Sequence, residues 1–326
     1  MASSSPRADG GGAHAAVDAP NLLYHLATAG AQRQAENDEK RLDAVAAAAL
    51  AWVERFEEQT SYSVLLVREG TAPKAKAPVQ QKRQRQKAKA APATRNLVRQ
   101  VVQEARRATP SATQGEALRA LDPTRRRAVG KALRRATRLS RSDQNYILVG
   151  LAGQGFKVVE APGEAEAQAA VWQKLGCVQV VVSQDFDAFL YGARRVIRTY
   201  EDLEVCDAKD EYEKIGATDF SEFLAAYIVA GQTEYAPGHP RATSPSVALQ
   251  VLREQGGFGA WMNALGATGR PYMDAYQIFT EPTACYCPPE AACICPAHRT
   301  EFVHGRGLER LRAGGKLVLG NFMEKP

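Results

Sequence analysis

The stretch at residues 161–187 constrains the fold of this chain more than any other. It reads APGEAEAQAAVWQKLGCVQVVVSQDFD. Its early proline and the alanine-rich run that follows predict a helix from Pro162 to about Leu175. The apolar, β-branched run Val178–Val182 predicts a buried strand. A helix leading into a buried strand is typical of an α/β fold, in which a mostly parallel central sheet is flanked by helices.

Four carboxylates lie at the two edges of this stretch. Glu164 and Glu166 belong to the first turn of the predicted helix, and Asp185 and Asp187 follow the strand. Residues beyond the carboxyl end of a strand face the ligand crevice of an open α/β sheet. Converging carboxylates repel one another, so we expect divalent cations to neutralise them. The alternative is that the glutamates favour the helix dipole and Asp185 caps the next helix.

Other predicted strands also end beside acids. The apolar run His14–Val17 ends at Asp18, and Ser63–Val67 is followed by Glu69. Phe156–Val159 is the strand that leads into the central stretch. Asp18 has an alternative role as the cap of the helix that begins next to it.

The whole chain of 326 residues is long enough for one large α/β domain or two smaller ones. It contains no run of 18 apolar residues, so we expect no membrane span. Its Ser/Gly-rich start lacks the apolar core of a secretion signal. We therefore expect a soluble intracellular protein, nuclear or cytoplasmic and not secreted, with Cys177 and Cys206 as reduced core thiols.

Basic residues are concentrated in one segment. Residues 74–141 contain 20 Lys or Arg and 3 acids, although the net charge of the chain is only +6. Helices are predicted at 95–108 and 115–138. A basic insert on an acidic body indicates that one part binds a polyanion and the other binds metal. The alternatives are a solvated or disordered linker and, for Lys82–Lys87, a nuclear signal.

Two motifs carry a resemblance to a known family. The run APGEAEAQ…SQDFDAFLYGARRVIR resembles the second nuclease block of the flap endonuclease/XPG-type 5′ nucleases. The run V-D-A-x-N-x-x-Y, from Val17 to Tyr24, resembles their first metal-binding block. The resemblance implies a PIN-like 5′ nuclease fold with a helical basic arch and a helical C-terminal part.

The resemblance also implies roles for single residues. Asp18 would be a metal ligand, and Tyr24 would stack on a substrate base unless it is a core residue. Glu69 stands where the family usually has Asp. Glu234, in G-Q-T-E-Y, takes the place of the Asp in the family's G-x-D-Y block.

Basic residues of the arch match family positions by register. Lys76 and Arg83 fall where arch residues contact the scissile phosphate, so we expect both to act in catalysis. Lys82, Arg134 and Arg135 are expected to contact the phosphate backbone without sequence preference.

The resemblance divides the chain into six segments. They are a flexible tail (1–13), an N-terminal nuclease segment (14–72), the basic arch (73–141), an internal nuclease segment (142–232), a degenerate helix-turn-helix duplex-binding region (233–270) and a C-terminal region (271–326).

The expected chemistry is hydrolysis of DNA phosphodiester bonds by a two-metal mechanism, with Mg²⁺ or Mn²⁺. We predict a structure-specific 5′ nuclease, cutting 5′ flaps or 5′ ends in replication or repair as a monomer, without sliding-clamp contact. An RNA-cleaving enzyme on the same fold and a non-catalytic nucleic-acid-binding relative are the alternatives. The predicted metal site comprises Asp18, Glu69, Glu164, Glu166, Asp185, Asp187 and Glu234.

The C-terminal region contains a cysteine-rich run, CYCPPEAACICPAH. Its thiols at Cys285, Cys287, Cys293 and Cys295, with His298, are potential structural zinc ligands. Their C-x-C spacing differs from the usual C-x2-C knuckle, so a cysteine-rich loop without zinc is the alternative.

Overall fold

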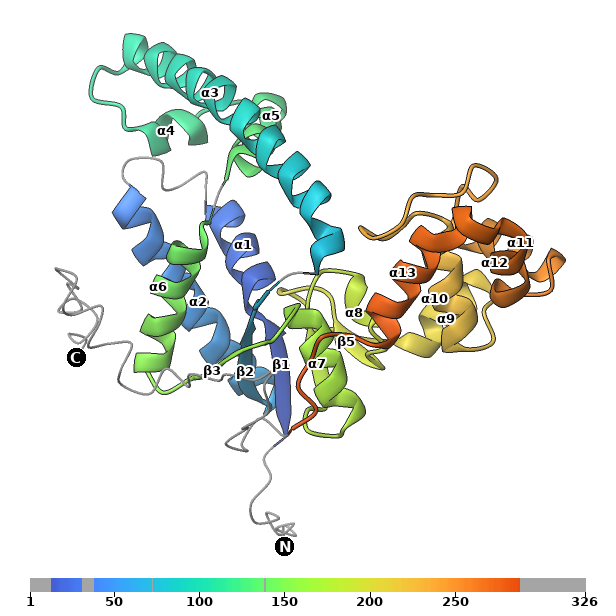
Figure 1. The fold of residues 1–326 in the computed structure, drawn as a ribbon. Coiled ribbons are helices and arrows are strands. Elements are labelled where there is room, and N and C mark those ends of the chain that lie inside the picture. Colours follow the sequence, from blue (N-terminus) through green and yellow to red (C-terminus); the bar gives the residue numbers. More distant parts are fainter. Residues whose placement is uncertain (1–12, 31–37, 72, 138, 288–326) are drawn as a thin grey trace, which may run out of the picture.

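The computed structural model describes residues 13–30, 38–71, 73–137 and 139–287 (Figure 1). Its centre is a six-stranded sheet with the order β3-β2-β1-β4-β5-β6. Every neighbouring pair is parallel except β5 and β6, so the predicted mostly parallel sheet is confirmed. The strands are β1 (His14–Asp18), β2 (Ser63–Arg68), β3 (Lys157–Glu160), β4 (Val180–Val182), β5 (Arg195–Ile197) and β6 (Val205–Asp207).

Helices cover both faces of this sheet (Figure 1). Alternate side chains of each strand enter two separate cores: Leu65 and Val67 belong to the core that includes Trp172, whereas Val64 and Leu66 belong to the core that includes Phe56 and Ile147. The helices of this part are α1 (Ala19–Gly30), α2 (Asp38–Thr60), α6 (Arg141–Gly153), α7 (Ala165–Lys174) and the short α8 (Asp187–Leu190).

The helix predicted from Pro162 begins later, at Ala165. The residues before it form a turn that is hydrogen-bonded to the segment after β2. The Pro162 carbonyl accepts the amide of Thr71 (3.1 Å), and the Gly163 carbonyl accepts the amide of Gly70 (2.8 Å). A Cβ on Gly70 would lie 1.9 Å from the carbonyl oxygen of Ala161, so only glycine fits there. The turn therefore follows β3 directly and lies against the end of β2.

The basic insert rises beyond the carboxyl edge of the sheet as a helical unit (Figure 1). It comprises the 3-10 turn η1 (Lys74–Lys76), α3 (Ala77–Ala108), α4 (Gln114–Arg119) and α5 (Pro123–Ala136). The prediction of a helix at 95–108 was wrong in extent, because α3 is one helix that continues through Pro92. Its inner side packs on α4 and α5 in a small core around Val101, Leu118 and Val129.

The predicted helix at 115–138 is divided into α4 and α5. The first part ends at Arg119. Asp122 caps the start of the second part, because its carboxylate accepts the amides of Thr124 (2.9 Å) and Arg125 (3.0 Å). Pro123 then begins α5 at a position where a missing amide hydrogen does not matter.

The remaining helices form a cluster beside the sheet. Two of its glycines, Gly256 and Gly257, have φ values of +82° and +98° and make a tight turn between two of these helices. The cluster comprises α9 (Ala208–Ile215), α10 (Phe220–Val229), α11 (Pro245–Glu254), α12 (Phe258–Leu265), the 3-10 turn η2 (Gly266–Gly269) and α13 (Arg270–Thr280). Within the described ranges, no helix is both long and apolar enough to span a membrane.

Candidate active site

The acids predicted from the sequence meet where the parallel strands end. Asp18 is the last residue of β1, and Glu69 follows β2 directly. The turn after β3 carries Glu164, and the loop after β4 carries Asp185. Because β1 and β4 are neighbours from which the chain winds in opposite directions, their ends open a crevice of the kind in which α/β proteins bind ligands.

Three glutamates form the tightest part of this cluster. One carboxylate oxygen from each of Glu69, Glu164 and Glu166 lies within 4.8 Å of the others. Among the described residues, Glu164 Oε1 and Glu166 Oε2 are buried and lack a hydrogen-bond partner. Leaving such oxygens unsatisfied is unfavourable, whereas Mg²⁺ and Mn²⁺ prefer oxygen ligands. The donor set therefore fits a hard divalent cation.

Asp18 both caps a helix and faces the cluster. Its Oδ1 accepts the amide of Asn21 (3.1 Å), so the capping role is present. Its Oδ2 accepts the hydroxyl of Ser183 (3.0 Å) on the neighbouring strand end. Burial raises the pKa of Asp18 to about 7. Burial, and next the charge of Asp18, raise the pKa of Glu166 well above its ordinary value.

Asp187 lies at the other end of the cluster. Burial, followed by the charge of Asp185, raises the pKa of Asp187 to about 8. The exposed Asp185 accepts the amide of Asp187 (3.3 Å), so it also helps to begin α8. Burial likewise raises the pKa of Glu69, and the positive charge of Lys76 offsets only part of that rise. Burial is the main cause of the raised pKa values across the cluster, and the charges of neighbouring acids add to it.

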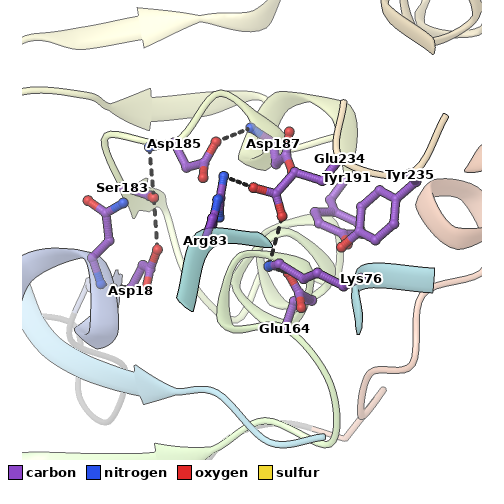
Figure 2. Close-up of polar contacts among 11 residues, drawn as sticks. Asp18, Lys76, Arg83, Glu164, Ser183, Asp185, Asp187, Tyr191, Glu234 and Tyr235 are labelled. Carbon is purple, nitrogen blue, oxygen red and sulfur yellow. Dashed lines mark hydrogen bonds and ion pairs between the residues drawn. The ribbon is translucent and has the colours of Figure 1, made fainter. Parts of the chain in front are cut away.

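Two cations from the base of the arch enter this acidic cluster (Figure 2). Lys76 forms an ion pair with Glu164, and its Nζ lies 3.8 Å from Glu234 Oε2. Arg83 pairs with the other oxygen of Glu234. Burial lowers the pKa of Lys76, but the Glu164 carboxylate and further acidic neighbours outweigh burial, so the net pKa is raised.

A cavity of about 940 Å³ lies between the acids and the arch. Tyr24 lines it with 37% of its surface exposed, so it is not a core residue. The ammonium group of Lys87 lies 4.6 Å from the centroid of the Tyr24 ring. Arg135 also lines the cavity, whereas Lys82 lines a smaller hollow elsewhere on α3.

Several residues of the site were missed at the level of sequence. Ser183 is fully buried and binds Asp18 and the amide of Asp185 (3.2 Å). Its place directly after a buried strand was a usable signal. The hydroxyls of Tyr191 and Tyr235 lie 3.3 Å apart, and Figure 2 draws both rings beside Lys76. No sequence signal marked Tyr191.

The predicted zinc site lies only partly within the described residues. Cys285 is buried and Cys287 is half-buried. Cys293, Cys295 and His298 lie outside the described residues, so zinc binding stays a prediction. The same holds for the predicted phosphate contact of Arg134, whose side chain is not among those described.

Comparison with known proteins confirms the resemblance. Residues 155–231 match the family model of the XPG I-region. Flap endonuclease 1 of Methanothrix thermoacetophila is 32% identical over 148 residues, which cover 40% of this chain and 43% of that protein. Flap endonuclease 1 of Methanocaldococcus jannaschii is 35% identical over 132 residues, covering 39% of each chain. The matched region thus spans about two fifths of these curated relatives.

Solved structures show the same fold over a larger part of the chain. The flap endonuclease-1 structure from Methanococcus jannaschii superposes with a TM-score of 0.54 at 24% identity, covering 83% of this chain and 79% of that chain. The catalytic core of Rad2, solved with a DNA substrate, gives a TM-score of 0.54 at 15% identity, covering 85% and 82%. The fold class is therefore the PIN-like nuclease fold. Within that class, the chain resembles the XPG-type nucleases, with flap endonuclease 1 among its relatives.

Proposed function

We propose that this chain is a metal-dependent, structure-specific 5′ nuclease that hydrolyses phosphodiester bonds of DNA, as flap endonucleases and 5′–3′ exonucleases do. The observation that carries the proposal is the convergence of acids from separate strand ends beneath a basic arch. Buried carboxylate oxygens without partners favour a cation site there. The relatives named flap endonuclease 1 add independent support.

The acids divide into two parts in this proposal. Glu69, Glu164 and Glu166, with Asp18 beside them, would hold one Mg²⁺ or Mn²⁺ ion. Asp185, Asp187 and Glu234 would contribute to a second at the other end of the cluster. When bound, such ions lower the pKa of an attacking water, neutralise phosphate charge and stabilise the leaving oxygen.

The arch residues would act on the phosphate. Lys76 and Arg83 pair with Glu164 and Glu234, so both cations lie beside the carboxylates that would hold the ions. From there they would donate hydrogen bonds to the oxygens on which charge develops during cleavage. Tyr24, exposed in the same cavity, would stack on a base and set the position of the scissile bond.

The decisive experiment compares a labelled 5′-flap DNA with the RNA of the same sequence and shape, each with and without Mg²⁺. We expect Mg²⁺-dependent cleavage of the DNA and none by the Asp185→Ala, Asp187→Ala double variant. Faster cutting of the RNA would support the RNA-cleaving alternative. Binding without cleavage of either would support a non-catalytic relative, and unchanged cutting by the double variant would refute the site.

A further inference from the structure

Residues 281–287 form a segment, here called the strap, that leads from α13 back to the sheet. Figure 1 shows its orange-red trace leaving α13 and passing beside α7. Three strap residues, Pro282, Ala284 and Cys285, are buried. The proposed function assigns the strap no role.

The strap is held to α7 by hydrogen bonds from two side chains. Gln168 is completely buried, and its Nε2 donates to the carbonyl of Cys285 (2.8 Å) while its Oε1 accepts the amide of Cys285 (2.6 Å). One turn further along α7, the indole nitrogen of Trp172 donates to the carbonyl of Cys287 (2.9 Å). Because both ends of the Gln168 amide are used, its orientation is fixed.

The strap also touches the turn that carries the first acid. A Cβ on Gly163 would lie 2.6 Å from the carbonyl oxygen of Thr283 in the strap. On its other side, Gly163 accepts the amide of Gly70 (2.8 Å), next to Glu69. The turn is thus enclosed between the end of β2 and the strap.

These contacts oppose the repulsion within the acidic cluster. Glu164, at the N-cap position of α7, and Glu166, in its first turn, lie four and two residues before Gln168, to which the strap is hydrogen-bonded. Glu166 has Asp18, Asp185 and Glu164 as acidic neighbours, and when these are ionised their repulsion would push the first turn of α7 outward. Lys76 counters part of this repulsion from the side of the arch. The strap contacts hold the turn and α7 from another side.

We propose that Gln168 is a positioning residue: through the strap, it holds Glu164 and Glu166 at the separation that a divalent cation requires. The consequence for cleavage rests on the proposed nuclease function, but the consequence for cation binding does not.

The test uses two glutamines at opposite ends of α7. Gln168→Met removes both strap hydrogen bonds and keeps the length of the side chain. Gln173→Met is the matched control, since Gln173 accepts the amide of Arg194 (2.6 Å) and donates to the carbonyls of Gln179 (3.1 Å) and Arg195 (2.9 Å), away from the acids. Trp172→Phe removes one strap hydrogen bond and is the milder variant should Gln168→Met fold poorly.

Three measurements are made on each variant of the whole chain. They are Mn²⁺ binding by calorimetry, thermal unfolding without metal, and kcat and KM on labelled 5′-flap DNA. We expect Gln168→Met to weaken Mn²⁺ binding about 10-fold and to lower kcat more than it raises KM. Trp172→Phe should also weaken Mn²⁺ binding and lower kcat, but to a smaller extent. Gln173→Met should lower the unfolding temperature and leave Mn²⁺ affinity unchanged.

Two outcomes separate this proposal from the nuclease assignment. If wild type cuts DNA and Gln168→Met matches Gln173→Met in Mn²⁺ affinity and kcat, the positioning role is overturned and the nuclease stands. If no protein cuts DNA but Gln168→Met alone weakens Mn²⁺ binding, the positioning role is supported and the nuclease assignment fails.

Discussion

The ammonium group of Lys76 pairs with the buried carboxylate of Glu164, joining the base of the arch to the residue that directly precedes α7. The two residues are 88 positions apart in the chain. The pair stabilises the negative charge of Glu164, which is buried among other acids. It also places a cation of the arch inside the site.

Lys76→Met should therefore affect both stability and catalysis. Removing one partner of a buried pair leaves the other uncompensated, so we expect a lower free energy of unfolding, by about 3 kcal/mol. We expect kcat on a 5′-flap DNA to fall about 100-fold or more, as on removal of a transition-state donor. Urea unfolding and single-turnover cleavage measure the two effects.

The control for Lys76 is Arg83→Met. The Arg83 side chain is 58% exposed, so its loss should change stability by less than about 1 kcal/mol while still slowing cleavage. Loss of DNA affinity alone, with an unchanged chemical step, would show that the two cations only tether phosphate.

Glu166→Gln should stabilise the metal-free protein and abolish its function. The side chain is buried among like charges, so a neutral isostere relieves repulsion and should raise the unfolding temperature by about 1–3 °C. Mn²⁺ should no longer raise that temperature, and cleavage should fall by at least about 100-fold. A variant that is less stable without metal and still stabilised by Mn²⁺ would contradict the assignment.

The raised pKa values predict the pH dependence of the metal-free protein. Asp187 has a pKa of about 8 in the folded chain, against an ordinary value of 3.8. Between these values the folded state binds more protons than the unfolded state, so this carboxyl lowers stability as pH rises from about 4 to about 8. Asp187→Asn should thus gain stability relative to wild type across that range, measured by urea unfolding in a chelator. If the difference in free energy of unfolding between the variant and wild type stayed constant with pH, the raised pKa of Asp187 would be excluded.

Salt dependence of DNA binding should distinguish two arginines of the arch. Arg135 lines the central cavity, so Arg135→Ala should reduce the slope of log affinity against log salt by about 1. Arg125 is already paired with Glu104 (2.9 Å), so Arg125→Ala should reduce that slope less. Equal slopes in both variants would place the nucleic acid elsewhere on the arch.

Much of the fold was predictable because local pattern decides it. Short apolar, β-branched runs favour buried strands, and the strands Val180–Val182 and Ser63–Arg68 lie close to their predicted bounds. The arch was predicted less well. Its highly basic sequence also permits disorder, and the core around Val101 and Leu118, made with α4 and α5, is a tertiary contact that stabilises the second half of α3.

The candidate site shows the same division. Acids placed directly after strands, as Asp18 and Glu69 are, indicate a site because parallel strands end at a common edge. Tyr191 and Gln168 gave no comparable signal, because each acts through a partner that is distant in sequence.

The sequence by itself determined the strands, the acids that follow them and the basic character of the arch, since these depend on residue type and local spacing. Tertiary structure alone decided that β1 lies beside β4, that Lys76 meets Glu164 and that the strap covers α7. The physical reason is that such contacts depend on packing between distant segments, which no local periodicity records.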